Sequence, residues 1–257
     1  MLGMDHLPLQ QSSAFAGALR AFGSTVVSDN PVVLQRRFGP LGRVDFASRL
    51  PIRDLAARPR IVNGEEDAPT AYRTAGYRQI LTPAHVALWD LTAEDLTRSM
   101  TGAWRNQLRK AQASNLRIIE NVWTGGDHWL FSNAEALARA RRFKTYPTSL
   151  LAAFAQTNRG KARLFEAWLG ETPFAACLTL SHGPTATYQT AWTSTEGRSA
   201  EAGRLLLHAA ALRLRRLGHQ TFDLGLVETD HAPGLARFKL GTGAELRRLG
   251  GTWLRLS

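Results

Sequence analysis

The stretch TFDLGLVETDHAPGLARFKLGTG, residues 221–243, is the most informative part of this sequence. Its first five residues predict a short β-strand, because β-branched and aromatic residues dominate them. A loop and a short helix, residues 228–239, then lead to Gly241 and Gly243. Glycines at such positions let another group approach the backbone closely. Lys239 lies between the aromatic Phe238 and these glycines, so it is the first residue that we single out for function.

The elements around this stretch follow a regular order over residues 126–257. Three strands separated by short turns predict an antiparallel meander. A long amphipathic helix follows and ends at Gly218. In chain order, we predict helices at 132–142 and 148–156, strands at 162–169, 174–181 and 185–192, a helix at 200–217, a strand at 221–225, a short helix ending at Lys239, and a final strand at 252–256.

The first part of the chain predicts a second mixed α/β unit. Thr92 is a favourable N-cap for a helix that begins after Leu91 and breaks at Thr101-Gly102. We therefore divide the chain into residues 1–125 and residues 126–257. Within the first part we predict a helix at 15–22, strands at 31–38, 43–47, 77–81 and 86–91, the end of a strand followed by a turn at 60–67, the broken helix up to residue 114, and a strand at 116–120.

The composition is that of a folded globular protein, since 44% of the 257 residues are apolar and 21% are charged. No stretch approaches the roughly twenty apolar residues of a membrane-spanning helix. Residues 1–11 lack a basic patch followed by an apolar run. We therefore predict no transmembrane segment and no secretory signal, and expect a cytoplasmic protein. Cys177 is the one cysteine, and its apolar neighbours predict a buried hydrophobic residue rather than a nucleophile.

The chain is strongly basic, with a net charge of +11, and four of its 32 basic residues are lysines. Arginine suits phosphate because its planar fork binds two oxygens at once. Nucleic acids, anionic cofactors and acidic membrane surfaces are therefore candidate partners. A GC-rich genome would explain the arginine-to-lysine ratio but not the net charge. The excess is spread along the chain without a basic tail, so an anion would bind a folded surface.

The order meander, long helix, strand, helix, strand resembles the acyl-transfer half of a GNAT domain. Individual residues are similar to those of the FemABX family, whose C-terminal signature is a Phe-Asp strand followed by Gly-Leu-x-x-Phe-Lys-x-Gly-x-Gly. Phe222-Asp223 and residues 234–243 match that signature. The segment WRNQLRKA, residues 104–111, resembles an Arg-Lys-Ala helix in the first half of the same family. The resemblance covers about residues 90–257.

This resemblance implies a mixed α/β fold of two tandem GNAT-like halves, of which the first, residues 1–125, is trimmed. Each half would be a mixed, mostly antiparallel sheet flanked by helices. It also implies transfer of an aminoacyl group from aminoacyl-tRNA to an amine acceptor, such as a peptidoglycan precursor or a small molecule. The amine would attack the activated carbonyl directly, without a covalent enzyme intermediate and without a required cofactor.

The resemblance also supplies candidate catalytic residues, namely Lys239, Phe238 and Asp223. An ammonium at position 239 would stabilise the oxyanion that forms when the amine attacks an ester. The alternative for Lys239 is an ion pair with Glu245 or Asp223 that fixes the loop. Asp223 would accept a proton from the amine or orient it, or else cap backbone N–H groups at the end of its strand.

Two further groups complete the candidate site. The aromatic residues among them also suit a core, and the basic residues also suit a solvated helix face. The histidines are scattered without ligand spacing, so we predict no metal. The candidates for substrate binding are Tyr188, Trp192, Asp230, His231, Arg237, Gly241 and Gly243, and those for binding tRNA or phosphate are Trp104, Arg105, Arg109, Lys110, Arg198 and Arg204.

GNAT enzymes that use acetyl-CoA hold its pyrophosphate on a glycine-containing loop at the N-terminus of the helix after the meander. The equivalent stretch here is RSAEAG, residues 198–203. Glu201 replaces the middle glycine of that loop, and its carboxylate would oppose a pyrophosphate. A first-turn carboxylate also stabilises a helix. The alternatives to aminoacyl transfer are an N-acyltransferase that uses acyl-CoA or an acyl carrier, and a non-catalytic GNAT-like module that binds RNA or protein.

Overall fold

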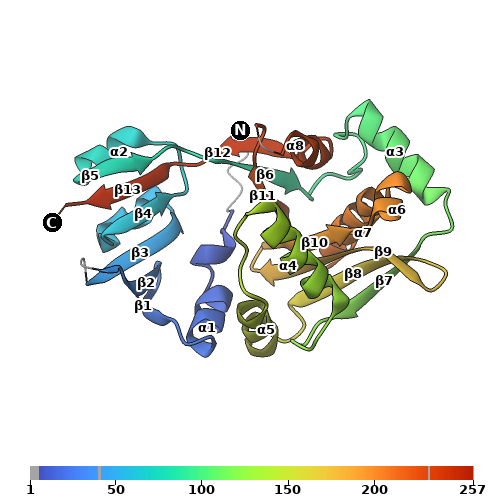
Figure 1. Cartoon of the computed structure of the whole chain (residues 1–257). Coiled ribbons are helices and arrows are strands. Elements are labelled where there is room, and N and C mark those ends of the chain that lie inside the picture. The colour runs from blue at the N-terminus through green and yellow to red at the C-terminus, as the bar shows by residue number, and fades with distance from the viewer. Residues whose placement is uncertain (1–5, 40–41, 231, 257) are drawn as a thin grey trace.

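The computed structural model describes residues 6–39, 42–230 and 232–256, which form two β-sheets lying side by side (Figure 1). We call them the first and the second sheet. The first sheet has the strand order β1 (Thr25–Asp29), β2 (Val32–Arg37), β3 (Arg43–Leu50), β4 (Ile61–Gly64), β13 (Gly251–Arg255) and β5 (Tyr77–Leu81). The second has the order β12 (Glu245–Arg248), β6 (His85–Asp90), β11 (Thr221–Val227), β10 (Thr185–Thr193), β9 (Thr172–His182), β8 (Ala162–Leu169) and β7 (Arg117–Val122).

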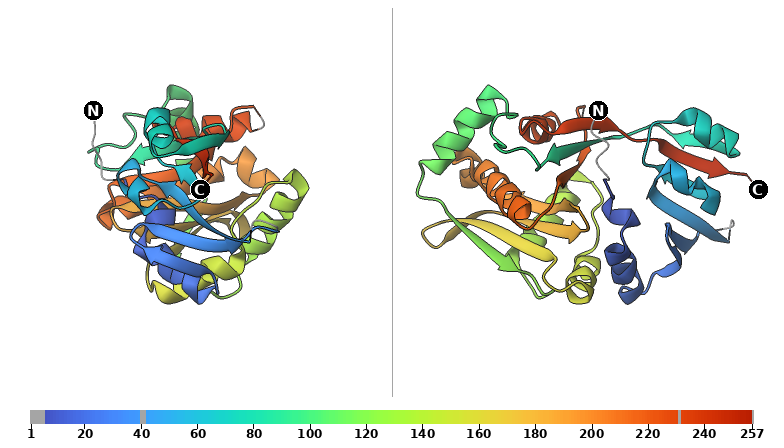
Figure 2. Two further views of the ribbon diagram at one scale, coloured as in Figure 1. Left: turned by 90° about the vertical axis from the view of Figure 1, so that its left-hand side faces the viewer. Right: turned by 180° about the vertical axis from the view of Figure 1, so that it is seen from behind.

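Helices cover both faces of the second sheet. Seen from opposite sides, α4 lies in front of one face and α7 in front of the other (Figures 1 and 2). The helices are α1 (Ser13–Ala21), α2 (Pro69–Thr74), α3 (Gly102–Gln112), α4 (Trp129–Arg141), α5 (Thr148–Thr157), α6 (Thr195–Ser199), α7 (Ala202–Arg216) and α8 (Pro233–Leu240), with short 3-10 helices at Leu9–Gln11 and Ile52–Ala57. None of the described helices is long and apolar enough to cross a membrane.

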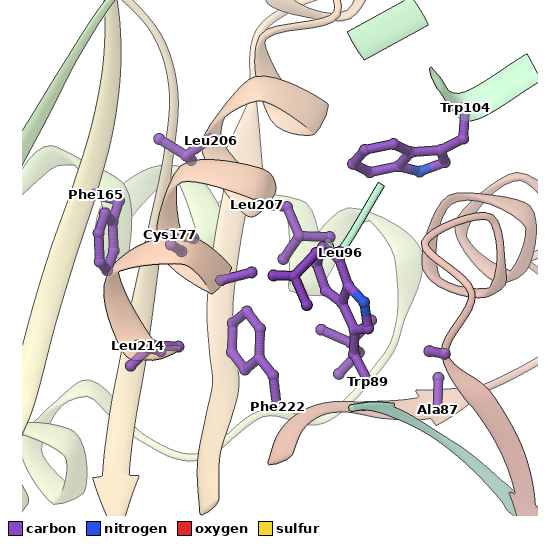
Figure 3. Close-up of a cluster of buried hydrophobic side chains, with 14 of the residues drawn as sticks. Ala87, Trp89, Leu96, Trp104, Phe165, Cys177, Leu206, Leu207, Leu214 and Phe222 are labelled. Carbon is purple, nitrogen blue, oxygen red and sulfur yellow. The ribbon is translucent and has the colours of Figure 1, made fainter. Parts of the chain in front are cut away.

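The alternating side chains of β9 join the second sheet to two separate cores. Cys177 belongs to the core under α3 and α7, together with Trp104, Leu207 and Phe222 (Figure 3). Its neighbour Ala176 faces the opposite side and belongs to the core formed with α1, α4 and α5. The expectation that Cys177 is buried is confirmed, because none of its surface is exposed. Burial also raises the pKa of its thiol, as expected for a residue that is no nucleophile.

The predicted fold class is confirmed: the chain is mixed α/β, with two mixed sheets flanked by helices. The predicted meander is β8, β9 and β10, which pair antiparallel in chain order. Strands from both sides of residue 125 build each sheet, since β6 and β7 join the second and β13 joins the first. The predicted division of the chain therefore does not coincide with a division between the sheets.

The helix predicted after Leu91 is wrong, because residues 92–101 form turns and bends. The carboxylate of Asp90 accepts hydrogen bonds from the backbone and the hydroxyl of Thr92, at 2.8 and 2.7 Å. Asp95 binds Thr97 in the same way. Such local bonds compete with helix formation. The helix begins instead at Gly102, where Thr101 accepts a bond from the Trp104 amide and forms the N-cap.

Strands β10 and β11 diverge, and this divergence places the candidate site. They pair in parallel only from Thr185 to Thr187 on β10, opposite residues 221–223 on β11. Beyond that point β10 has a bulge between Tyr188 and Thr190, and β11 shifts register against β6 after Asp223. The two strands therefore leave backbone groups and side chains free to face the space between the sheets.

Candidate active site

A cavity of about 610 Å³ lies between the two sheets. The first sheet contributes Arg49 and Thr252 to its lining, and the second contributes Tyr188 and Leu226. Lys239 reaches the same cavity from α8. A concave site of this size, formed where two layers meet, is the kind of place in which small substrates bind.

The side chain of Lys239 is nearly buried in this cavity, with 7% of the residue exposed. Its Nζ donates a 2.7 Å hydrogen bond to the main-chain carbonyl of Leu226. Burial lowers the pKa of Lys239 from 10.5 to about 8, although the charge of Asp223 acts in the opposite direction. No carboxylate forms an ion pair with Lys239 among the described residues, so the alternative of a structural pair with Glu245 or Asp223 is not what holds it.

The turn after Asp223 passes beside the ammonium of Lys239. Gly225 has a φ of +76°, a conformation that side chains rarely adopt. A Cβ at this position would lie 3.8 Å from Nζ of Lys239. The φ of this turn therefore explains the glycine, because a Cβ would make only an ordinary contact with Lys239.

Asp223 is almost completely buried, and both of its carboxylate oxygens accept hydrogen bonds. Arg49 Nη1 donates to Oδ2 at 2.6 Å, and the amide of Gly225 donates to Oδ1 at 2.7 Å. Burial, the largest single influence, would raise the pKa of Asp223. The positive charge of Arg49, together with smaller contributions that include the hydrogen bonds from Gly225 and Arg49, holds the pKa below its usual value. Asp223 thus has the geometry of the strand-end cap rather than that of a proton acceptor.

Arg49 and Glu65 complete a buried polar network that sequence reasoning missed. Nε and Nη2 of Arg49 donate to the two oxygens of Glu65 at 2.6 and 3.0 Å. Arg247 on β12 also donates to Glu65. The ring of His6 lies 3.1 Å from Arg49 Nη2, and burial lowers its pKa to about 3, so it is neutral. No local motif could have revealed this network, because Arg49 and Asp223 stand 174 positions apart.

A second cavity, of about 690 Å³, lies on the other side of α8. Trp104, Arg204 and Arg237 are among the residues that line it. The guanidinium of Arg204 stacks 5.9 Å from the ring centroid of Trp104 and 5.8 Å from that of Phe238. The indole of Trp104 also donates to the backbone carbonyl of Phe238 at 2.9 Å. Lys239 thus lines the first cavity, whereas its neighbour Phe238 contacts Trp104 and Arg204, two residues that line the second.

Three predicted phosphate-binding residues, Arg105, Arg109 and Lys110, are exposed on α3. The same helix carries Trp104, which is buried and lines the second cavity. Arg109 bonds to Asn106 on its own helix, but neither Arg105 nor Lys110 forms an ion pair among the residues that the structure describes. This helix thus presents unneutralised positive charge beside the second cavity.

The loop before α7 departs from a pyrophosphate cradle in two ways. Glu201 adopts a φ of +58°, which glycine would favour, and its carboxylate pairs with Arg204. Arg198 turns back to the end of β10, where it donates to the carbonyl of Thr193 at 2.8 Å and to the hydroxyl of Thr195 at 3.2 Å. The side chains of Arg198 and Arg204 are therefore already engaged by the chain itself.

The remaining candidates are distributed over several environments. Tyr188 lines the first cavity, and burial raises the pKa of its hydroxyl. Trp192 packs edge-on against Trp129 at 5.8 Å, in the core beneath α4. Asp230 is exposed and accepts a bond from Thr229, whereas His231 lies outside the described residues. In the ranges that the structure describes, no group of three potential ligand side chains could hold a metal ion.

Gly241 and Gly243 make close approaches to their own chain. A Cβ at Gly241 would lie 2.5 Å from the ring of Trp104, and one at Gly243 would lie 2.4 Å from the carbonyl of Ser99. Both glycines let α8 pack against α3 and against the segment before it. Contact with a substrate is therefore not needed to explain either glycine.

Comparison with known proteins assigns the chain to a family. Residues 104–240, more than half of the chain, match the family described as acetyltransferase (GNAT) domain. No curated protein matches the sequence. The crystal structure of FemX is similar over 98% of this chain and 96% of that one, with a TM-score of 0.73 and 14% identity.

Two further solved structures share the fold. The C-terminal domain of a putative lysylphosphatidylglycerol synthetase from Agrobacterium fabrum has a TM-score of 0.61 and 14% identity, over 97% of this chain and 89% of that one. A tandem GNAT protein from the clavulanic acid biosynthesis pathway has a TM-score of 0.52 and 15% identity, over 94% and 86%. The chain belongs to the GNAT acetyltransferase family, and its tandem fold is FemABX-like, as the sequence predicted.

Proposed function

We propose that this acyltransferase moves an aminoacyl group from aminoacyl-tRNA to the amine of an acceptor such as a peptidoglycan precursor. The observation that carries the proposal is the position of Lys239, whose ammonium faces the cavity between the sheets and is held by a main-chain carbonyl. The basic face of α3 beside the second cavity supports an RNA donor, because RNA binding rests largely on phosphate contacts. The fold shared with FemX supports aminoacyl transfer rather than another acyl group.

The reaction would proceed by direct attack. The free amine of the acceptor, held in the first cavity, adds to the ester carbonyl, and a C–N bond forms. The N–H groups of Lys239 stabilise the oxyanion, while the Leu226 carbonyl keeps the ammonium in place. The C–O bond to the ribose then breaks, and the ribose oxygen leaves with the proton that the amine gives up.

The direct test is a transfer assay with tRNA that carries a radiolabelled amino acid. With the protein and a muropeptide precursor that has a free lysine amine, label should leave the RNA and appear on the precursor. Label that stays on the RNA, while an acyl-CoA is consumed in a parallel reaction with the same acceptor, would replace this proposal with CoA-dependent acyl transfer.

The pH dependence of transfer should report on Lys239. The pKa of about 8 means that the ammonium is present below that pH and is lost as the pH rises through it. The free fraction of the acceptor amine, a lysine with a pKa of about 10.4, rises over the same range. The two effects offset each other, so we expect the single-turnover rate to rise up to about pH 8 and then to level off. Lys239→Arg keeps its charge at high pH, so its lower rate should go on rising above pH 8. A wild-type rate that still rises at pH 9.5, beyond about one unit above this pKa, would show that the ammonium is not required.

The loop at Glu201 gives the matching test for CoA. We expect CoA to bind weakly to the wild-type protein, because the carboxylate would oppose the pyrophosphate. Glu201→Gly removes that charge, frees Arg204 and suits the positive φ, so calorimetry should show tighter CoA binding. Micromolar binding of CoA to the wild type would favour the CoA-dependent function. Weaker binding to the variant would mean that this loop is not the cradle.

A further inference from the structure

Arg49 connects the first sheet to the reacting centre in the second. It lies near the end of β3 with a φ of +53°, a conformation that costs free energy in a residue other than glycine. Its side chain is 11% exposed and spans from Glu65 to Asp223. A strained backbone that is kept in place by buried ion pairs calls for a reason beyond local folding.

The contacts continue from Arg49 to Lys239 without a gap. Arg49 holds one oxygen of Asp223 at 2.6 Å, and the other oxygen holds the amide of Gly225 at 2.7 Å. The residue after Gly225 is Leu226, whose carbonyl accepts the bond from Lys239 at 2.7 Å. The register shift of β11 falls between Asp223 and Leu226, so the two residues between them are not in the regular pairing with β6.

We propose that Arg49 is a positioning residue for Lys239. It fixes the carboxylate of Asp223, which in turn fixes the turn of residues 223–226 whose carbonyl holds the ammonium. The proposal rests on the proposed function, because Lys239 matters here as the group that meets the oxyanion. It also gives the first sheet a role in the reaction, since Arg49 belongs to β3.

The charges around this site indicate that Arg49 acts on Lys239 through Asp223 and not directly. Asp223 on β11 is the charged group that acts on Lys239, and it raises the pKa of the lysine. Arg49 is in turn the main charge that acts on Asp223. The other titratable groups that surround the network are Glu65, which Arg49 and Arg247 neutralise, and the buried His6 and His182, whose pKa values burial lowers to about 3 and about 4.

The pKa of Lys239 can be measured without any substrate. Competitive labelling with trace acetic anhydride, followed by mass spectrometry of the peptide that contains Lys239, gives the pH at which the amine becomes reactive. Asp223→Asn should lower this midpoint, because it removes the charge that favours the ammonium. Arg49→Met should raise the midpoint by roughly one pH unit as long as Asp223 stays ionised. Without Arg49, the carboxylate of Asp223 is no longer neutralised and favours the ammonium of Lys239 more strongly.

A double-mutant cycle decides the proposal. If Arg49 acts through Asp223, then Arg49→Met should shift the midpoint in the wild-type background and leave it unchanged in the Asp223→Asn background. The same shift in both backgrounds, or none in either, would overturn the proposal. Should Arg49→Met fail to fold, Arg49→Lys replaces it in the same two backgrounds. Lysine at position 49 keeps one charge but cannot bridge both carboxylates. The shift of the Lys239 midpoint should therefore be smaller than with methionine, and it should again be absent in the Asp223→Asn background.

An ion pair between α1 and the first sheet provides the control. Arg20 and Asp29 form a 2.6 Å pair that is about half exposed. Arg20→Met should leave the Lys239 midpoint unchanged. The labelling experiment needs neither donor nor acceptor. If the double-mutant cycle gives the expected result but the transfer assay fails, the failure counts against the proposed function and not against the role of Arg49.

Discussion

Replacing Lys239 with methionine is expected to lower the turnover of acyl transfer by about 10²–10³-fold, or roughly 3–4 kcal/mol, the usual effect of removing one preorganised oxyanion donor. Methionine keeps the length of the buried side chain and removes the charge. The loss should fall on the chemical step, so single-turnover rates should drop while the affinities for both substrates change little. Lys239→Arg should recover little, because a planar guanidinium does not place its N–H groups where the Leu226 carbonyl holds the ammonium.

The melting temperature of the same two variants separates catalysis from structure. A lysine that merely tied α8 to β11 through the Leu226 carbonyl would show lower stability and near-normal turnover in the molecules that remain folded. Methionine relieves the desolvation of a buried charge, so we expect its stability to be close to that of the wild type. Full turnover in a destabilised Lys239→Met protein would end the catalytic assignment.

The sequence predicted the elements whose signals are local. The turns of the meander, the residues of α3 from Trp104 onward, and the Phe-Asp strand are all marked by neighbouring residues, and the structure confirms them. The helix predicted within residues 92–101 does not form, because the carboxylates of Asp90 and Asp95 accept hydrogen bonds from threonines two positions ahead. These local bonds offer the backbone an alternative to a helix. The short β12 was missed because its four residues are mostly exposed and lack an apolar pattern.

Within the candidate site too, the residues with local sequence signals could be predicted and the others could not. Lys239 and Phe238 were predicted because they stand next to each other in a recognisable motif; the structure places Lys239 in the first cavity and Phe238 beside Arg204. Trp192 has the same aromatic character but packs in the core, since strand periodicity does not reveal which face of a sheet borders a cavity. Arg49 and Glu65 became visible only when the first sheet was placed against the second.

The second large effect is expected on tRNA binding when the exposed basic residues of α3 are changed. Changing Arg105, Arg109 and Lys110 together to glutamate should weaken tRNA binding and flatten its dependence on salt. Each phosphate contact releases about one counterion, so the loss of three should reduce the slope of log affinity against log salt by about 2–3. Filter binding of tRNA at several salt concentrations measures both quantities. Melting curves must accompany it, because acidic residues in the last turn of a helix are unfavourable.

A matched charge reversal on the first sheet distinguishes a local contact from the general field of a protein with a net charge of +11. Arg36, Arg37 and Arg43 are exposed on β2 and β3, and reversing them changes the net charge by the same amount. If α3 contacts the RNA, its reversal should flatten the salt slope and the control reversal should leave the slope nearly intact. Equal effects of the two changes would mean that tRNA responds to overall charge. An unchanged slope after reversal of α3 would remove this helix from the donor-binding surface, while leaving the role of Lys239 to be decided by the turnover of its own variants.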